Sequence, residues 1–277
     1  MKHEESSFQG AKGVKIYYQI WKPDTSKPKG CVQIIHGLPE HSGRYMSVVN
    51  SLVSAGYTVY ANDQRGHGKS EGKRAFVDCF SDFVEDMGIF RQIIREQEPA
   101  IPSFILGYSI GSFVAQLYVV SYSEDLRGLI LAGSGTGSGL SANRLLIPLI
   151  KVVSKLIPRK TLDPRLGEHI SRDPEVVKAY KEDPLVSKVI TVRIGAEILN
   201  VVKQIYQNAP KIQLPCLFQS GSEDKIVIGV EALFDRFTVK DKTLKIYDGA
   251  YHDIYNELPN TRKIVLKDLI NWIDEHL

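Results

Sequence analysis

A serine flanked by two glycines interrupts an apolar run near the middle of the chain. Residues 103–117 read SFILGYSIGSFVAQL, in which a strand-like stretch ends at Gly107 and apolar residues resume at helical spacing after Ser109. The pattern Gly107-x-Ser109-x-Gly111 predicts a sharp strand-to-helix turn that exposes the serine hydroxyl. The motif alone is weak, because glycine and serine are common residues. A serine hydroxyl becomes a nucleophile only when a base takes its proton and an acid orients that base, so a histidine and a carboxylate must also be found.

Alternating strand-like and helix-like segments surround this turn. Most of the strand-like segments are continuously apolar, as burial on both faces of a parallel sheet requires. They are residues 14–21, 31–37, 57–64, 103–109, 127–133, 216–221 and 243–249. Helical patterns lie between them at residues 44–55, 81–96, 110–121, 229–237 and 261–275. This alternation predicts an α/β fold with a doubly wound, mostly parallel central sheet flanked by helices.

The alternation fails between residues 136 and 210, where helical patterns follow one another with no buried strand among them. We therefore expect an inserted helical cap at 136–210, between a first part of the core at 1–135 and a second part at 211–277. The cap holds twelve Lys or Arg and seven Asp or Glu, so it carries +5, and the rest of the +3 chain carries −2. Its apolar run LLIPLIKVVSKLI is explained by packing of the cap over its own active site, which we favour. The alternative is transient contact of the cap with an anionic membrane or micelle surface.

The base is sought among the histidines that follow Ser109, because α/β-hydrolases place the nucleophile, the acid and the histidine in this order along the chain. His169 lies in the cap, and His276 is the penultimate residue. His252 follows the strand-like TLKIYDG in the short loop GAYHD, just before the last helix. From this loop a histidine side chain can lie over the carboxyl edge of the sheet. His252 is therefore the predicted general base.

The acid is predicted one strand earlier at the same edge of the sheet. Asp224 follows the strand-like CLFQSG in the segment GSEDKIV. Glu223 is its close rival, and we favour Asp224 because the KIV that follows it begins the next packed segment.

Two backbone amides must stabilise the oxyanion that forms on the carbonyl oxygen. One is the amide of Ile110, directly after the predicted nucleophile. The other is expected in IIHGLPEH, where Pro39 has no amide hydrogen and Leu38 is the natural donor. His36 and His41 of this segment are then expected to be structural.

Composition argues against several other classes of protein. A net charge of +3 over 277 residues is too small to indicate nucleic-acid binding. The polar start MKHEESSFQGAKG lacks the apolar core of a secretory signal, and no stretch approaches the roughly 18 apolar residues of a spanning helix. We expect a cytoplasmic protein, with peripheral membrane association as an option. The cysteines at 31, 79 and 216 are odd in number and lack metal-ligand spacing, so we expect no disulfide framework, metal or cofactor.

Five segments, in their order and spacing, resemble the monoacylglycerol lipase family of serine hydrolases. They are HGLPEHSGRY, NDQRGHGKSEG, GYSIG, GSEDKIV and GAYHDIYNE, and the cap stretch ISRDPEVVKAYKEDPLV is similar as well. The resemblance spans nearly the whole chain. Two residues depart from the family pattern: Pro39 stands where the family usually has Gly, and Tyr108 where it usually has His.

The resemblance implies an α/β-hydrolase fold and a carboxylic ester hydrolase that cleaves a monoacylglycerol into a fatty acid and glycerol. It also implies that Glu40 and Arg44 line or brace the polar head-group end of the pocket; the alternative is an ion pair that only holds their loop. A lysophospholipase or a general carboxylesterase would use the same machinery. A catalytically silent ligand-binding member of the fold would typically have lost a member of the triad, whereas all three residue types are present here.

Overall fold

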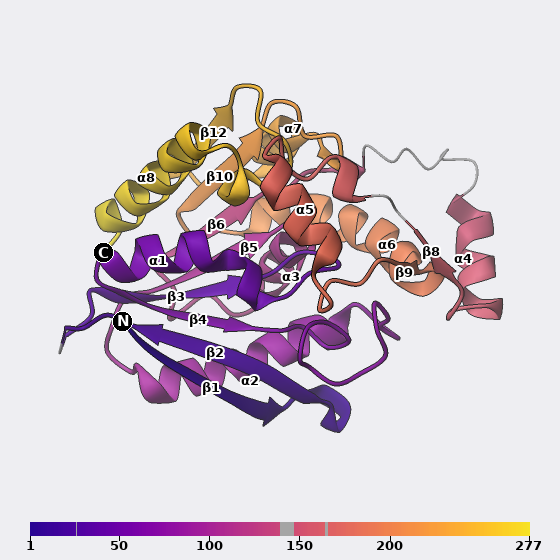
Figure 1. The fold of residues 1–277 in the computed structure, drawn as a ribbon, viewed down its shortest axis with the longest axis horizontal. Coiled ribbons are helices and arrows are strands. Elements are labelled where there is room, and N and C mark those ends of the chain that lie inside the picture. Colours follow the sequence, from indigo (N-terminus) through magenta and orange to yellow (C-terminus); the bar gives the residue numbers. More distant parts are fainter. Residues whose placement is uncertain (26, 139–146, 164–165) are drawn as a thin grey trace.

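A single large sheet forms the centre of the molecule. The computed structural model describes residues 1–25, 27–138, 147–163 and 166–277 (Figure 1). Within these ranges eight strands pair in the order β1-β2-β4-β3-β5-β6-β10-β12. Their bounds are β1 Lys2–Gln9, β2 Lys15–Lys22, β3 Gly30–Ile35, β4 Tyr57–Asn62, β5 Ser103–Tyr108, β6 Gly128–Ala132, β10 Cys216–Gly221 and β12 Lys242–Tyr247.

The sheet is parallel from β4 to β12 and antiparallel only at its β1–β2–β4 edge. In the central strands, Ile34 of β3 pairs with Leu106 of β5, which pairs with Ile130 of β6. All residues of β3, β4, β5, β6 and β10 are buried, which explains why these segments are nearly continuous apolar runs. The predicted mostly parallel α/β sheet is therefore confirmed.

Helices cover both faces of this sheet. Side chains of β5 alternate between the faces: Phe104 and Leu106 pack with α1 and α8, whereas Ile105 packs with α2 and α3. The helices of the core are α1 Met46–Ser54, α2 Ser81–Gln97, α3 Ile110–Val119, α7 Val230–Arg236 and α8 Pro259–Glu275. Short 3₁₀ turns are η1 Ala11–Gly13, η2 Ser42–Tyr45, η4 Leu166–Glu168, η5 Ala209–Lys211 and η6 Ile254–Asn256.

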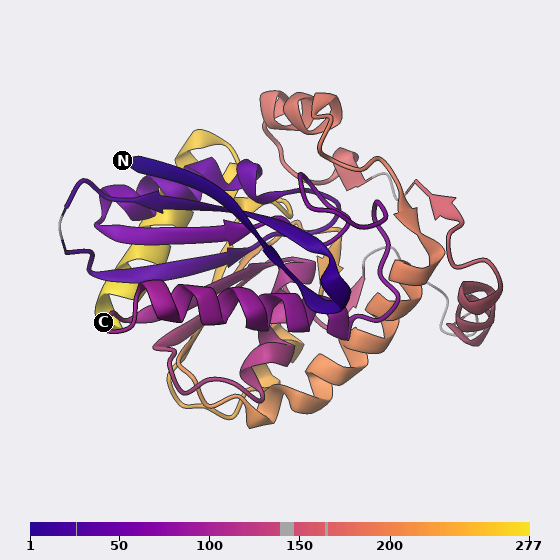
Figure 2. The same cartoon turned by 90° about the horizontal axis from the view of Figure 1, so that it is seen from below.

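A group of helices lies beyond the carboxyl ends of the parallel strands, between β6 and β10 in the sequence. It contains α4 Ile147–Leu156, α5 Pro174–Glu182 and α6 Val192–Asn208. Figures 1 and 2 place α4 and α5 at the end of the molecule toward which the arrowheads of β3 and β4 point. Two-residue ladders join β8 Thr161–Leu162 to β9 Ile190–Thr191, and β7 Gly137–Ser138 to β11 Val227–Ile228.

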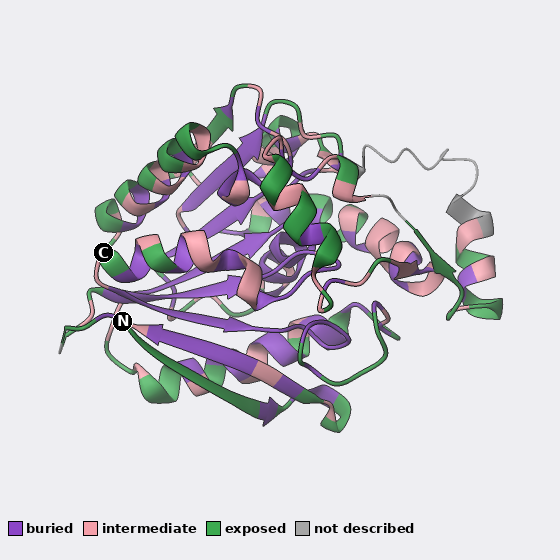
Figure 3. Ribbon diagram, viewed as in Figure 1, coloured by how far each residue is buried: buried purple, intermediate pink, exposed green. Residues whose placement is uncertain are grey.

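All seven predicted strands are present in the sheet. They are β2, β3, β4, β5, β6, β10 and β12, and each begins and ends within two residues of its predicted bounds. In the eight-stranded sheet the missed strand is β1, whose sequence KHEESSFQ buries only Phe8; the two-residue strands β7, β8, β9 and β11 were not predicted either. Figure 3 shows β1 as an exposed edge beside buried inner strands. A polar edge strand has no apolar pattern to detect, and its charges discourage pairing with another chain. The parts of the expected cap at 139–146 and 164–165 lie outside the described residues.

Candidate active site

The turn after β5 holds Ser109 in an unusual backbone conformation. Its φ of 52° and ψ of −123° lie in a region that residues with a side chain rarely adopt. The Ser109 amide donates to Ala132 O over 2.8 Å, and Ser109 O accepts from the amide and the hydroxyl of Ser112 over 2.9 and 2.6 Å. Hydrogen bonds from both sides therefore fix the turn.

Close approach of the main chain explains the glycines of the motif. A Cβ on Gly111 would lie 2.1 Å from Ile35 O, and a Cβ on Gly107 would lie 2.6 Å from Gly111 O. Neither position has room for a side chain. The first turn of α3 can thus sit directly against the end of β3, which presents Ser109 at the edge of the sheet.

His252 and Asp224 meet Ser109 at this edge. His252 Nδ1 lies 2.6 Å from Asp224 Oδ2, and His252 Nε2 lies 2.9 Å from Ser109 Oγ. An ionised carboxylate only accepts, so Nδ1 carries the proton and Nε2 accepts from the serine hydroxyl. The side chains of His252 and Asp224 are 5% and 3% exposed, which shields both hydrogen bonds from water. This geometry is that of a general base held by an acid and poised to deprotonate a serine.

The rival carboxylate, Glu223, lies elsewhere. Its side chain is exposed, and only its amide is engaged, donating to Ala250 O over 3.0 Å. Asp224 Oδ1 accepts from the amides of Ile226 and Val227 over 2.8 and 3.0 Å, so its second oxygen is directed at His252. Between the two candidates, only Asp224 touches the histidine.

The electrostatics of the site favour an ionised Asp224. Burial raises the pKa of Asp224, but the charge of His252, its hydrogen bond and two backbone amides lower the pKa below the ordinary value. For His252, burial lowers the pKa, whereas Asp224, Asp253 and Glu40 raise it, and the net pKa lies above the ordinary value. Burial and the charge of Glu40 raise the pKa of Asp253 to about 6. Two further carboxylates therefore influence the base.

The loop after β3 and the start of α3 place the two expected oxyanion donors, Leu38 and Ile110, at the same cavity as the serine. Leu38 and Ile110 both line the cavity that contains Ser109. Within the part of the chain that the structure describes, neither of their amides donates a hydrogen bond to the protein. Both amides are therefore available to an incoming oxygen. The peptide bond between Leu38 and Pro39 is cis.

The His36 side chain holds the loop after β3 in place, which is the structural role expected for it. Its Nδ1 donates to Gly37 O over 2.7 Å, and its Nε2 accepts from the amide of Gln64 over 2.8 Å. Burial lowers the pKa of His36 to about 4, which keeps the imidazole neutral and preserves this donor–acceptor pattern. His41 contacts Asp183 over 2.9 Å and so connects the loop to the end of α5.

Glu40 and Arg44 form a buried ion pair at one end of the site. Arg44 Nε donates to Glu40 Oε2 over 3.2 Å, and Arg44 Nη2 lies 3.8 Å from Asp253 Oδ2. The other Glu40 oxygen accepts from Tyr45 Oη over 2.5 Å. Glu40 lines the catalytic cavity, whereas Arg44 is not among its lining residues and lies 4.9 Å from the centre of the Tyr180 ring. Glu40 and Arg44 are therefore in contact with each other, but of the two only Glu40 lines the cavity.

The cavity itself has a volume of about 640 Å³ and a lining of two kinds, which we call the apolar chamber and, for the polar group beside His252, the polar end. Apolar side chains of the core and of the helices beyond it line most of the wall: Leu38, Phe113, Val153, Ile157, Ile198 and Val202. Glu40, Tyr108 and Asp253 form a polar group beside His252: the Tyr108 ring centre lies 5.1 Å from that of His252, and Arg44 pairs with both carboxylates. Ser109 Oγ, 2.9 Å from His252 Nε2, lies next to this group.

Tyr108 and Asp253 are site residues that the sequence reasoning missed. Each is the immediate neighbour of a predicted catalytic residue, and each is 4% exposed. A buried carboxylate in a loop is unusual enough to suggest a role, but burial is not readable from the sequence. The available signals were adjacency to Ser109 and His252 and, for Tyr108, its departure from the family pattern.

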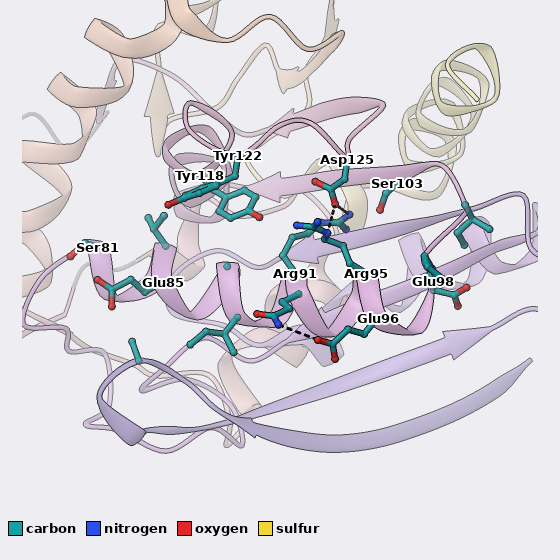
Figure 4. Close-up of a pocket in the computed structure, with 17 residues that line it drawn as sticks. Ser81, Glu85, Arg91, Arg95, Glu96, Glu98, Ser103, Tyr118, Tyr122 and Asp125 are labelled. Atoms are coloured by element: carbon teal, nitrogen blue, oxygen red, sulfur yellow. Dashed lines mark hydrogen bonds and ion pairs between the residues drawn. The ribbon is translucent and has the colours of Figure 1, made fainter.

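A larger hollow of about 1190 Å³ lies elsewhere, against α2 and the end of α3 (Figure 4). Polar groups of its lining pair with one another: Arg91 Nη2 donates to Asp125 Oδ2 over 2.6 Å, and Gln92 Nε2 donates to Glu96 Oε1 over 3.1 Å. Its lining contains serines but no histidine to activate them. Nucleophilic chemistry therefore belongs to the smaller cavity.

The described ranges contain neither a metal-binding cluster nor a membrane-spanning helix. No three His, Cys, Asp or Glu side chains in those ranges are grouped so as to hold a metal ion. None of the helices described combines the length and the apolar character needed to cross a bilayer.

The fold, the strained serine turn and the hydrogen-bonded histidine define a serine hydrolase of the α/β-hydrolase fold. Residues 26–259 match the family described as "Serine aminopeptidase, S33". The chain belongs to this family of serine hydrolases.

Relatives and solved structures agree with this assignment. The chain is 37% identical to a monoacylglycerol lipase of Mycolicibacterium smegmatis over 276 residues, which covers 99% of this chain and 98% of the relative. It is 32% identical to a human monoglyceride lipase over 269 residues, 96% of this chain and 88% of the relative. The crystal structure of the Paleococcus ferrophilus monoacylglycerol lipase superposes with a TM-score of 0.81 at 30% identity and full coverage of both chains. The predicted family resemblance is confirmed.

The position of the acid yields a prediction. Asp224→Asn should lower kcat by about 10⁴, because the amide cannot hold His252 in the tautomer that accepts the serine proton. Glu223→Gln, the exposed neighbour, should keep nearly wild-type kcat. Steady-state hydrolysis of a p-nitrophenyl ester measures both, with circular dichroism to verify folding. The opposite pattern would move the acid to Glu223.

The pH profile tests the electrostatics around His252. The base must be neutral, so kcat/KM should rise with pH through the pKa of His252. Asp253→Asn removes a negative charge that raises this pKa, so the rising limb should move to lower pH. Asp248→Asn, which changes an exposed carboxylate on the same segment, should leave the limb in place. A limb that moves upward or stays fixed in Asp253→Asn would contradict this assignment.

Proposed function

We propose that the protein hydrolyses monoacylglycerols to a fatty acid and glycerol. The observation that carries the proposal is the lining of the cavity, which is apolar over most of the wall and polar in the group beside His252 and Ser109. Its volume of about 640 Å³ is in the range of pockets that hold one small ligand, roughly 300–1,000 Å³. The names of the M. smegmatis, human and P. ferrophilus relatives support the same substrate class.

The reaction would proceed through an acyl-enzyme. Ser109 Oγ attacks the ester carbon while His252 Nε2 takes its proton, and Asp224 stabilises the imidazolium. The amides of Leu38 and Ile110, which lack a protein acceptor among the described residues, would donate to the oxyanion. His252 then protonates the departing glycerol oxygen, and water releases the fatty acid by the same steps.

The helices of residues 136–210 would act as the cap of this site, between core segments 1–135 and 211–277. Support comes from α4 and α6, whose Ile150, Val153, Ile198 and Val202 line the apolar chamber. β6 and β10 are neighbours in the sheet although the cap separates them in the sequence. The cap would therefore supply the acyl-chain wall without interrupting the core.

Glu40 would face the glycerol, and Arg44 would hold Glu40 in place. Glu40 lines the cavity, whereas Arg44 pairs with Glu40 and Asp253 behind it. The two buried carboxylates also separate the candidate substrates. A lysophospholipid would bring an anionic phosphate beside Glu40 and Asp253, which costs electrostatic energy at a buried site. An uncharged glycerol head group avoids that cost.

Substrate preference tests the single-chain pocket. Monoacylglycerols with medium or long chains should be hydrolysed much faster than di- or triacylglycerols. Each buried methylene contributes about 0.8 kcal/mol, so kcat/KM should rise severalfold per two carbons until the chamber is full. Titration of released fatty acid over a chain-length series measures this. Triacylglycerol turnover as fast as that of monoacylglycerol would refute the proposal.

The outer surface of α4 and of the segment after it, up to residue 162, would contact a lipid surface transiently. Val152, Leu156 and Leu162 are 54%, 76% and 55% exposed. Lys151, Lys155, Arg159 and Lys160 are exposed around them, and residues 147–162 contain no acidic residue. Exposed apolar side chains surrounded by positive charge fit an anionic bilayer.

Vesicle binding tests this contact. Leu156→Ser should weaken partitioning onto vesicles of phosphatidylglycerol and phosphatidylcholine by about tenfold, because a large apolar side chain contributes about 1.5–3 kcal/mol when buried. Ile264→Ser removes a comparably exposed side chain, 56% exposed on α8, and serves as the control. Equal binding of both variants in cosedimentation would exclude a role for α4.

A further inference from the structure

Tyr108, the residue before the nucleophile, is held rigidly at the polar end of the cavity. A Cβ on Gly37 would lie 3.0 Å from its Cδ1, and a Cβ on Gly133 would lie 3.4 Å from its Cε2, so main chain flanks both edges of the ring. The ring centre lies 5.1 Å from that of His252 and 5.9 Å from that of Tyr45. The direction of the Tyr108 hydroxyl is therefore fixed by packing.

This hydroxyl is left without a protein partner. Within residues 1–25, 27–138, 147–163 and 166–277, no hydrogen bond to Tyr108 Oη is formed. Tyr108 lines the catalytic cavity, and its oxygen is not among the polar atoms that are both buried and unpaired. Tyr45, by contrast, donates to Glu40 over 2.5 Å. A ligand in the cavity can reach the Tyr108 hydroxyl.

The surroundings keep this hydroxyl a neutral donor. Burial and the charges of Asp253 and Glu40 raise the pKa of Tyr108 well above its ordinary value. Asp253, bound by the Asn256 side-chain amide over 3.0 Å, lines the same end of the cavity as a hydrogen-bond acceptor. One free donor beside carboxylate acceptors matches the needs of an alcohol, which both accepts and donates.

We propose that Tyr108 is a specificity-determining residue whose hydroxyl donates a hydrogen bond to a free hydroxyl of the alcohol part of the ester. The neighbouring carboxylates of Asp253 and Glu40 accept from the same polyol. This inference rests on the proposed monoacylglycerol hydrolysis and assigns its head-group selectivity to a residue that departs from the family pattern. An ester of a simple alcohol, which has no free hydroxyl, makes no use of Tyr108 Oη.

Tyr108→Phe tests the inference because it removes only the hydroxyl and leaves the ring packing in place. We would compare kcat/KM for 1-decanoylglycerol and for ethyl decanoate, which share the acyl chain. The ratio of the two should fall about three- to tenfold, the loss expected for one neutral hydrogen bond. Tyr122→Phe, a matched change at a tyrosine that is 61% exposed on the other hollow, should keep the wild-type ratio. Melting temperatures verify that both variants are folded.

The outcomes separate the inference from the function on which it rests. A wild-type enzyme that prefers the glyceryl ester, with an unchanged ratio in Tyr108→Phe, overturns the inference and leaves the proposed function standing. Equal losses on both esters also overturn it, because Tyr108 would then act through His252 or by packing. A wild-type enzyme with no preference for the glyceryl ester overturns the proposed function and the inference together.

Discussion

The main-chain conformation of Ser109 is the constraint on which the site depends. A φ of 52° at a residue with a side chain costs about 1–3 kcal/mol, and the surrounding structure must supply that energy. It does so through the hydrogen bond from Ser109 N to Ala132 O and through the packing of Gly111 against Ile35 O. The same turn directs the serine oxygen toward His252 and leaves the Ile110 amide without an acceptor among the described residues. One strained residue thus positions two parts of the machinery.

The parallel sheet explains how distant residues meet at this turn. Ser109, Asp224 and His252 follow β5, β10 and β12, whose carboxyl ends lie at one edge of the sheet. Burial then makes their interactions strong, because the low local dielectric increases the attraction between His252 and Asp224. Glu40 and Asp253 add negative charge on the other side of His252 and are balanced by Arg44. The fold therefore sets both the geometry of the base and its affinity for the proton.

Local patterns in the sequence predicted the core of this arrangement. Continuous apolar runs marked the buried strands. Chain order left three histidines after Ser109, and the position of His252 in a short loop after a strand selected it among them. The strand β1 was missed because its sequence is polar. Asp224 was favoured over Glu223 only by the segment that follows it, because neighbouring loop residues differ in where the turn directs their side chains. Tyr108 and Asp253 were missed as site residues because the burial of both side chains and the position of the Tyr108 hydroxyl arise only when the side chains pack together. Sequence patterns report periodicity and spacing, whereas these features arise from contacts between segments far apart in the chain.

The central claim is that Ser109 is a nucleophile activated by His252. Labelling with a fluorophosphonate, followed by intact mass measurement and peptide mapping, tests it most directly. The account predicts a single adduct on Ser109, no adduct in a folded Ser109→Ala variant and much slower labelling in His252→Ala. An adduct on another residue, or labelling that persists at the wild-type rate in Ser109→Ala, would contradict it.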